Sequence, residues 1–348
     1  MNKTVFNERR CIRFNHFTNK GFALFSCLGK EVIIGILSVA TLSNAQAKGI
    51  STDVQKADTS LYKSGQPTLL DEVKVTGSRA PLTQSQQSRM VTVLSRKDVN
   101  AAPVHSVNDL LKLVSGVDVR QRGPLGAQTD VSIRGGNYEQ MTVLLNGINI
   151  GDPQTGHNAF DFPVDISEIE RIEILEGPAA SVYGTSSLLG AINIVTKANR
   201  TSSVTLHAAS GSFGSVTSGG RINVARGKWN NQLSGSFMRT DGYNRNKAGT
   251  LNTDFQSQKA FYQGFYDDDD LAISWHAGLS NKDFGSSTNY SSKYDDQFEH
   301  TFKTYTAVQA ETRKGAVKWR PAIYWNHNYD RFELFRDHAE RYPFNYHR

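Results

Sequence analysis

A strict two-residue alternation of hydrophobicity near residue 275 constrains the fold of this chain more than any other feature. Between Leu271 and Ser280, the odd-numbered residues are apolar and the even-numbered ones are small or polar. A period of two is that of a β-strand with one apolar and one polar face. Similar alternation recurs in six further segments, so we expect seven strands in the second part of the chain. These segments are residues 203–210, 216–225, 229–239, 258–266, 302–313 and 316–329.

The expected strands are joined alternately by short turns and long loops. Residues 226–228, 267–270 and 314–315 are short connections, whereas residues 240–256 and 281–301 are long ones. An outer-membrane β-barrel has this arrangement, with short periplasmic turns and longer extracellular loops. The strands are about 9–12 residues long, the length that crosses a bilayer at a tilt. A soluble β-sandwich is the alternative, but its loops would not sort in this way and its strands are usually shorter.

The composition excludes several other classes. The hydrophobic fraction is 38%, and no run of 18 apolar residues occurs in the 348 residues. A membrane-spanning helix needs about 20 consecutive apolar residues, so a helical membrane protein is excluded. Aromatic residues are spread over the chain and make up 10% of it, which argues against full disorder.

The first 47 residues have the features of a secretory signal peptide. A basic start is followed by an uncharged, mostly apolar stretch at residues 32–42, and then by Ala45-Gln46-Ala47, a cleavage pattern. Removing residues 1–47 takes away six of the 39 basic and two of the 33 acidic residues, which leaves a net charge of +2 instead of +6. The compositional support for nucleic-acid binding is thereby lost. Both cysteines, Cys11 and Cys27, leave with this segment, so no disulfide framework is expected.

The remaining chain has two compositions. Residues 71–199 contain four aromatic residues, namely Tyr138, Phe160, Phe162 and Tyr183, whereas the rest of the chain to residue 348 is rich in them. We therefore place a domain boundary near residues 197–201. Residues 48–70 are polar and mixed, and we expect a flexible tether there.

Residues 71–199 are expected to form a small α+β unit. Apolar residues at 107, 110, 111 and 114 have helical spacing, with Ser106 as N-cap and Gly116 at the end. Strands are expected at residues 90–94, 117–120, 130–134, 141–145, 171–175 and 192–196. Asn146-Gly147 is a turn signal.

Four segments of this unit resemble the TonB-dependent outer-membrane receptors, and most nearly their cobalamin transporters. They are residues 71–79 (DEVKVTGSR), residues 106–118 (SVNDLLKLVSGVD), residues 131–136 with 143–147, and residues 169–197. The last segment is the most specific, because it combines a strand, a Gly-Pro turn, a Tyr-Gly pair and a closing strand in the family's order. From residue 200 onward the resemblance is weaker, as barrel strands carry little signal each.

The resemblance implies an α+β plug domain (residues 80–199) inside an antiparallel transmembrane β-barrel of 22 strands, of which residues 200–348 would hold about seven. It implies import of a scarce nutrient across the cell outer membrane, driven by the TonB protein of the inner-membrane complex, with outer-membrane lipid and a surface-exposed accessory lipoprotein as further partners. Residues 71–79 would hold the TonB box, since an alternating segment without a core of its own can add to a partner's sheet edge. The alternative is that this segment is the first plug strand. The box residues are Asp71, Glu72, Val73, Lys74, Val75, Thr76 and Gly77.

Two plug loops resemble the apical loops that contact cargo in cobalamin transporters. They are polar, unpatterned and flanked by glycine, which suits adaptable contacts, although a solvated loop has the same composition. The candidate residues are Gln121, Arg122, Leu125, Gln128, Asp152, Gln154, Thr155, His157 and Asn158.

A further set of residues matches the family's structural positions in the plug. The family usually has Arg before the Gly-Pro turn, where this chain has Glu176, so the family's plug-to-barrel salt bridge is absent or reversed in sign. Arg134 matches the family pattern and is expected to form an ion pair at the plug–barrel interface. The other matching residues are Gly135, Gly177, Pro178, Tyr183 and Gly184.

Metal sites and catalytic motifs are sparse. Asn244, Asp254, Asp295 and Asp296 loosely resemble the acidic extracellular loops that bind calcium in cobalamin transporters, and calcium is the one metal that the sequence suggests. The acidic run at residues 267–270 falls on a short turn, where solvated carboxylates are expected. His157, His276 and His300 are isolated. No phosphate loop, Gly-x-Ser-x-Gly or Cys-His pair occurs, so we expect no enzyme and no cofactor.

Three functions remain open at this point. The first is TonB-dependent import, with cobalamin as the first cargo and a ferric siderophore as the second. The second is a surface binding or adhesion protein that uses the long loops without transport. The third is an inactive truncated product, because seven strands leave two unpaired edges in lipid, and the chain stops in what we expect to be an extracellular loop.

Overall fold

The computed structural model describes residues 74–75, 82–83, 91–104, 106–121, 128–152, 160–177, 187–196, 200–242 and 252–348. The expected signal peptide and tether lie outside these residues. In the described part of the chain, no helix is long and apolar enough to span a membrane. The first part holds short helices and small sheets, and the second part holds one large antiparallel sheet.

The first part, which we call the plug, is built on a five-stranded sheet of order β3-β8-β9-β6-β7. Its strands are β3 (Val91–Leu94), β6 (Met141–Leu145), β7 (Ile148–Asn149), β8 (Ile169–Glu176) and β9 (Gly190–Thr196). β6 and β9 are parallel, and the other neighbours are antiparallel. Two hairpins accompany it, one of β4 (Val117–Gln121) with β5 (Thr129–Ile133), the other of β1 (Lys74–Val75) with β2 (Leu82–Thr83).

Two short α-helices flank the plug sheet. α3 (Val107–Leu111) starts where the sequence predicts, because the Ser106 side chain accepts the backbone N–H of Asp109 at 3.2 Å. Its apolar side is buried, and Gly116 follows it with a φ of +83°, which favours glycine. α2 (Arg96–Ala101) was not predicted, although Ser95 and Asp98 form a capping box at its start. Two 3₁₀ turns, η2 (Tyr138–Gln140) and η3 (Ile166–Glu168), complete the described helices.

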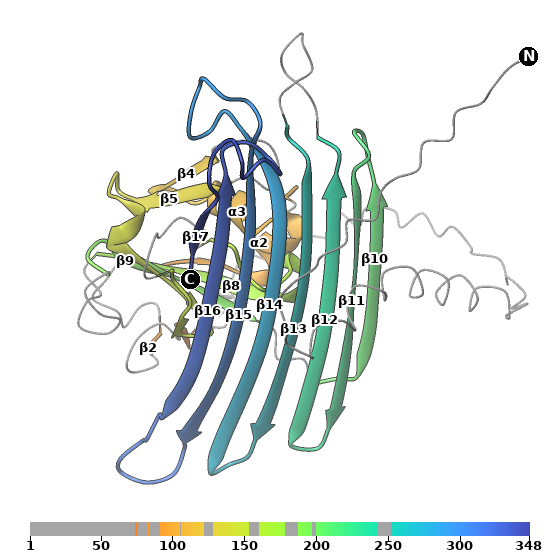
Figure 1. Cartoon of the computed structure of the whole chain (residues 1–348). Coiled ribbons are helices and arrows are strands. Elements are labelled where there is room, and N and C mark those ends of the chain that lie inside the picture. Colours follow the sequence, from red (N-terminus) through yellow and green to blue (C-terminus); the bar gives the residue numbers. More distant parts are fainter. Residues whose placement is uncertain are drawn as a thin grey trace, which may run out of the picture. The chain divides into compact units, whose positions relative to one another are not determined.

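The second part, which we call the wall, is a sheet in which eight strands pair antiparallel in chain order (Figure 1). The strands are β10 (Ser203–Ser210), β11 (Val216–Arg226), β12 (Trp229–Thr240), β13 (Phe255–Asp267), β14 (Leu271–Ser287), β15 (Gln297–Thr312), β16 (Ala322–Glu333) and β17 (Asn345–His347). All seven predicted strands are present. The connections 227–228, 268–270 and 313–321 lie at one end of the wall, which we call the short-turn end. The connections 211–215, 241–254, 288–296 and 334–344 lie at the other end, which we call the long-loop end.

Three boundaries in the wall differ from the prediction. β14 and β15 extend far into the expected loop at residues 281–301. The prediction missed these ends because the polar residues Lys282 and Asp283 face opposite sides of the sheet there, so no apolar alternation marks the strand. β16 starts at Ala322 rather than at residue 316, because Pro321 has no N–H to donate to a sheet ladder. Residues at the end of the chain were expected in a loop, but Asn345–His347 pair with β16.

The plug packs against one face of the wall, and a single core joins the two parts. Phe261, Tyr305 and Ala307 of the wall belong to the same buried cluster as plug residues such as Phe162 and Ile172. On β14 the even-numbered residues from His276 to Ser286 are buried on this inner face. The alternation that predicted the strands therefore separates a plug-facing side from an outer side.

Candidate functional site

The centre of the plug–wall contact is Asp161, a carboxylate in the plug segment that precedes η3. It is 7% exposed, and it accepts hydrogen bonds from Ser280 Oγ at 3.1 Å and Thr301 Oγ1 at 3.0 Å. Both donors lie on the inner face, one on β14 and one on β15. Asp161 thus joins the plug to two neighbouring wall strands.

Three lysines on neighbouring strands surround this carboxylate. Lys282 Nζ lies 3.8 Å from Asp161, while Lys259 Nζ donates to the Val164 carbonyl at 3.3 Å and Lys303 Nζ to the Ile150 carbonyl at 3.4 Å. Burial by itself would raise the pKa of the Asp161 carboxyl, but the three ammonium groups outweigh it and lower that pKa below its ordinary value of 3.8. Asp161 is therefore ionised at neutral pH.

A second buried carboxylate anchors the plug closer to the short-turn end of the wall. Glu168, at the end of η3, is fully buried, and it accepts a hydrogen bond from Gln232 of β12. Arg221 of β11 lies 3.8 Å from Glu168 and also donates to the Ser167 carbonyl at 3.2 Å. Sequence reasoning singled out neither Asp161 nor Glu168. An acidic residue within an apolar stretch (FDFPVDISEIE) is the signal that could have found them.

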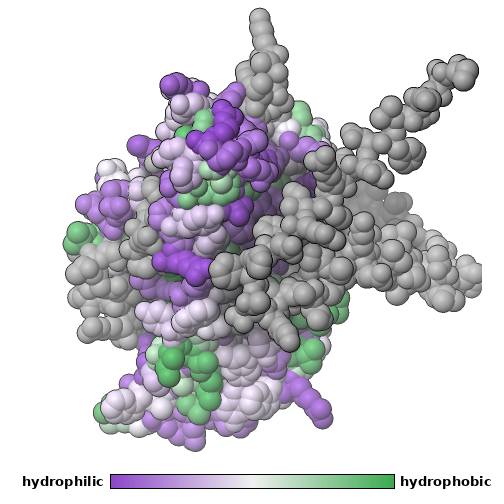
Figure 2. Space-filling view, viewed as in Figure 1, coloured by the Kyte–Doolittle hydropathy of each residue, from purple (hydrophilic) through white to green (hydrophobic). Residues whose placement is uncertain are grey.

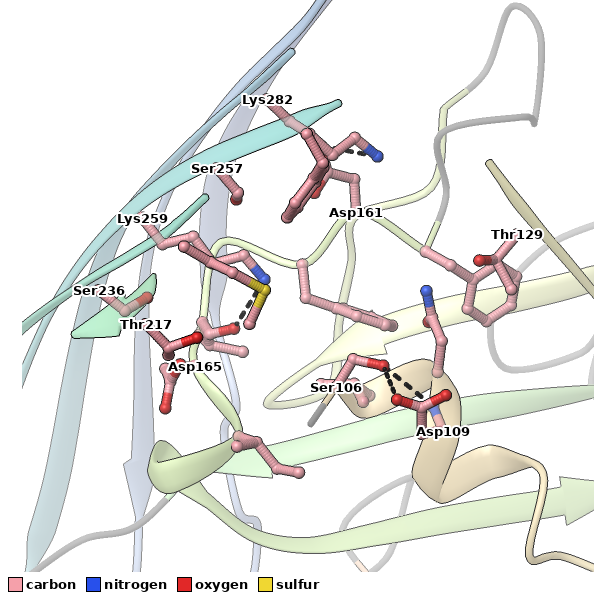
Figure 3. Close-up of a pocket in the computed structure, with 18 of the residues that line it drawn as sticks. Ser106, Asp109, Thr129, Asp161, Asp165, Thr217, Ser236, Ser257, Lys259 and Lys282 are labelled. Carbon is pink, nitrogen blue, oxygen red and sulfur yellow. Dashed lines mark hydrogen bonds and ion pairs between the residues drawn. The ribbon is translucent and has the colours of Figure 1, made fainter. Parts of the chain in front are cut away.

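A cavity of about 110 Å³ lies beside Asp161, between the plug and strands β11 to β14. Figure 3 shows Lys259, Lys282, Ser236 and Ser257 on the wall side, with Ser106 and Asp109 of α3 on the plug side. Its lining mixes these polar groups with apolar ones. The wall residues that line it lie near the long-loop ends of their strands. The apolar members of the lining are Val107, Phe160, Phe162, Val164, Ile166, Phe237, Met238 and Phe255.

The structure describes three of the nine predicted cargo-contact residues. Gln121 ends β4 and accepts a hydrogen bond from Lys112 Nζ at 3.1 Å. Gln128 is 2% exposed, and the Tyr290 hydroxyl in the β14–β15 loop donates to its side-chain oxygen at 2.6 Å. Asp152 is partly exposed. The other six lie outside the described residues, and they are Arg122, Leu125, Gln154, Thr155, His157 and Asn158.

Arg134 and Glu176 form a salt bridge with each other, with Nε to Oε2 at 2.8 Å. We expected an ion pair of Arg134 at the plug–barrel interface, whereas this pair lies within the plug, at the ends of β5 and β8. Glu176, which the sequence comparison marked as a departure from the family pattern, supplies the negative partner. Arg134 and Gly135 both have positive φ, of 52° and 74°, so Arg134 lies in a tight turn after β5. Gly177 also has positive φ, while Pro178, Tyr183 and Gly184 lie outside the described residues.

Two residues of the expected TonB box are described. Lys74 and Val75 form β1 and pair antiparallel with Thr83 and Leu82 of β2. Asp71, Glu72, Val73, Thr76 and Gly77 lie outside the described residues.

Among the acidic residues that suggested calcium, Asp254 is engaged by an arginine. Arg336 Nη1 donates to both carboxylate oxygens of Asp254, at 2.8 and 3.0 Å. Asp295 and Asp296 lie in the β14–β15 loop, and Asn244 lies outside the described residues. Within the described ranges, no three His, Cys, Asp or Glu side chains are grouped as a metal would require.

The acidic turn at residues 267–270 is paired with basic residues of the neighbouring turns. Lys228 Nζ lies 2.6 Å from Asp268, and Arg200 contacts Asp267 at 2.9 Å. The hydrogen bond from Lys228 lowers the pKa of Asp268 to about 2. These ion pairs tie the β10 entry and two short turns together.

The outer face of the wall is apolar and exposed. Nine large apolar side chains on it are at least half exposed, and Figure 2 shows hydrophobic residues gathered toward the short-turn end of the molecule. Near those turns, Trp229 contacts Tyr266 and Trp275 with ring centroids 4.8 and 6.0 Å apart. Soluble proteins rarely expose so much contiguous apolar surface. The nine residues are Val204, Leu206, Ile222, Val224, Trp229, Leu233, Val308, Ile323 and Trp325.

Comparisons with known proteins agree with this architecture. Residues 83–191 match the TonB-dependent Receptor Plug Domain. The vitamin B12 transporter BtuB of Vibrio vulnificus (strain CMCP6) is 28% identical over 242 residues, which cover 66% of this chain and 39% of that protein. Among solved structures, the copper transporter OprC superposes with a TM-score of 0.58 at 17% identity, over 72% of this chain and 39% of its own. The alcaligin receptor FauA of Bordetella pertussis gives 0.57 at 15% identity, over 75% and 42%.

A plug domain followed by consecutive antiparallel strands, with polar plug–wall contacts and an apolar outer face, defines the class of the TonB-dependent receptors. Residues 83–191 of the chain match the plug domain of this class, and the chain resembles the vitamin B12 transporter BtuB. It spans about two fifths of the length of the relatives that it matches. Those relatives are transporters and receptors by title, in line with the expectation that the chain is not an enzyme.

Proposed function

We propose that the protein to which this chain belongs imports a scarce nutrient across the cell outer membrane, with energy from TonB. The observation that carries the proposal is the plug seated on the inner face of the wall, where Asp161 and Glu168 hold it by buried polar contacts. Such contacts can exchange for water when a partner pulls on the plug, and they add to the apolar core that the plug shares with the wall. A seal that can be remodelled suits transport more than static adhesion.

The outer membrane is the proposed location for two reasons. The outer face of the wall exposes apolar residues in alternation with plug-facing ones, as a lipid-facing barrel strand does. The sequence starts with features of a secretory signal peptide, which would direct the chain out of the cytoplasm. In this orientation the long connections face outside and the short turns face the periplasm.

Cobalamin is the cargo that we propose first, on the basis of the sequence likeness to the vitamin B12 transporter. Cargo would meet the plug at its apical segments around Gln121, Gln128 and Asp152, together with the undescribed residues of the same loops. Gln128 is covered by Tyr290, so contact with Gln128 requires the Tyr290 side chain to move. The cavity beside Asp161 is lined in part by Gln121, one of these residues.

A ferric siderophore is the second candidate cargo. The observation that favours it is the structural likeness to receptors whose titles name siderophores, including the alcaligin receptor FauA and the siderophore receptor PirA of Acinetobacter baumannii. The TM-scores of 0.57 and 0.54 support the shared fold, and at identities of 15% and 18% the likeness extends to the fold alone.

Uptake of radiolabelled cobalamin tests the proposal directly. The full gene would be expressed in a strain that lacks its own cobalamin receptor, with and without a functional TonB. We expect uptake that depends on both the gene and TonB. Growth on a ferric siderophore without cobalamin uptake would replace the first cargo by the second. Neither uptake nor growth, with the protein assembled in the outer membrane, would favour a binding protein or an inactive product.

A further inference from the structure

Arg336 brings together three segments at the long-loop end of the wall. Its guanidinium donates to both oxygens of Asp254, which enters β13, across a separation of 82 residues in the chain. Its backbone N–H donates to the Asp296 carbonyl in the β14–β15 loop at 3.1 Å. Arg336 itself belongs to residues 334–344, which we call the rim loop.

The geometry of this contact is that of a strong cross-link. The two N–H···O distances of 2.8 and 3.0 Å from one guanidinium nitrogen to one carboxylate indicate a charge-assisted interaction. The same guanidinium lies 4.3 Å above the ring of Phe298 at the start of β15, a cation–π contact. Arg336 and Asp254 are 32% and 38% exposed, so water screens the pair only in part.

The segments that Arg336 contacts are fixed to the wall independently of it. Asn252 donates to the Gln297 carbonyl at 2.8 Å and accepts from the Ser287 backbone at 3.0 Å. The Asp254 carbonyl accepts the N–H of Gly285 at 2.9 Å. Residues 252–254 are therefore a firm base, and Arg336 is the group that attaches the rim loop to this base. The ring contact of Tyr294 with Phe335 adds a second, apolar attachment of the rim loop to the β14–β15 loop.

We infer that Arg336 is a positioning residue that holds the rim loop in place through Asp254, without a metal ion. The positive charge that links the rim loop to residues 252–254 belongs to an arginine side chain of the protein. The order of the rim loop therefore depends on this ion pair and not on a bound cation. Only the consequence of this inference rests on the proposed function. In a transporter, a rim loop that is ordered before cargo arrives loses less conformational entropy when cargo binds.

The test is hydrogen–deuterium exchange on the full-length protein in detergent, without cargo. R336Q is expected to raise exchange in residues 334–344, and D254N is expected to do the same although it lies 82 residues away in the chain. The double variant should exchange no faster than either single one, because both remove the same contact. EDTA or added calcium should leave the wild-type pattern unchanged.

R341Q is the matched control. The Arg341 guanidinium lies 3.9 Å over the ring of Phe335 within the same rim loop, so its loss should leave the base untouched. The charge swap D254R/R336D restores the pair with its partners exchanged, and it should recover part of the protection that R336Q loses. That variant also keeps the inference testable if R336Q assembles poorly.

Several results would overturn the inference. One is unchanged hydrogen exchange of residues 334–344 in D254N, and another is additive effects on this exchange in the double variant. The others are equal effects of R341Q and R336Q on this exchange, and faster exchange of the wild type on adding EDTA. Because exchange needs no cargo, these outcomes are independent of whether the protein imports cobalamin. If cobalamin is the cargo, R336Q should also bind it roughly tenfold more weakly.

Discussion

Asp161 shows how one residue can decide the contact between two parts of a chain. Its carboxylate is buried among three lysines and two hydroxyl groups, and it attracts all three ammonium groups. Removing one partner of a buried charge set is costly because the remaining charges stay desolvated. The sequence gives no periodic signal for such a residue, since its hydrogen-bond partners Ser280 and Thr301 lie 119 and 140 residues away on the wall.

D161N is expected to loosen the plug segment that contains it. We expect the opening free energy of residues 160–166, measured by hydrogen exchange, to fall by about 3 kcal/mol. D241N is the control, since Asp241 pairs with Arg239 at a site where both side chains are more than half exposed, and such pairs contribute little. An equal effect of the two substitutions would show that the lysine surroundings of Asp161 are not what holds the plug.

The same residue predicts a dependence on pH. The pKa of Asp161 is lowered in the folded protein, so its contribution is complete above the ordinary value of 3.8 and is lost as the pH falls through the lower folded value. Protection of residues 160–166 should therefore be flat from pH 7 to pH 5 and decrease in stronger acid. In D161N this acid-dependent part should be absent.

Val75 carries the prediction for the proposed TonB box. V75P removes a backbone donor and is expected to abolish TonB-dependent uptake while the protein still reaches the membrane. Val75 also pairs with Leu82 inside the chain, so L82P is the matched control, which breaks the same pairing and leaves the box intact. Loss of uptake in both variants would assign the effect to the hairpin and not to TonB.

At the level of the elements, the sequence predicted mainly the strands and the helix whose apolar residues repeat with a regular period. The seven wall strands and the start of α3 were found because each has an apolar face that repeats at two or 3.6 residues. β6 was found as a short, mostly apolar run, and all five of its residues are buried. The far ends of β14 and β15 were missed because polar residues occupy both faces there, above the apolar band. α2 is too short to show a helical period of apolar residues, and its capping box is the signal that the sequence contains for it.

The candidate site was less accessible to sequence reasoning than the strands. Lys259, Lys282 and Lys303 face the plug because strand register brings three neighbouring strands together, and a register cannot be read from one sequence. The Arg134–Glu176 pair could have been inferred from the departure at Glu176, but its location within the plug depends on how β5 and β8 end. Contacts between distant segments were thus the part that required a structure.

Gly278 sets how closely the plug approaches β14. A Cβ at this position would lie 2.9 Å from Pro163 Cβ and 3.2 Å from a ring carbon of Phe261, which is tighter than normal contact. G278V should therefore push the plug from the wall and cost about 1–3 kcal/mol, seen as a lower thermal midpoint of the full-length protein. G235V adds the same side chain on the same sheet, where the nearest atom lies 3.6 Å from a new Cβ. Equal midpoints for the two variants would mean that the plug is not in close contact at Gly278.

At the scale of the whole molecule, the outer face of the wall decides between a barrel in a membrane and a sheet in water. Leu233 lies on β12 with 55% of its surface exposed, next to Ile222 of β11 and Tyr262 of β13. In water, replacing an exposed leucine by arginine would change stability by less than about 0.5 kcal/mol. In a bilayer, the same replacement places a charge against lipid and costs about 2–4 kcal/mol near the midplane.

L233R should therefore reduce the amount of folded, protease-resistant full-length protein in outer-membrane fractions, whereas S292R in the exposed β14–β15 loop should not. The comparison is informative because Leu233 lies on the outer face of the wall and Ser292 is exposed in a loop, so a change in plug packing cannot explain a difference. If both variants assembled like the wild type, the apolar outer face would have to meet something other than lipid, and the proposed import across the outer membrane would lose its physical basis.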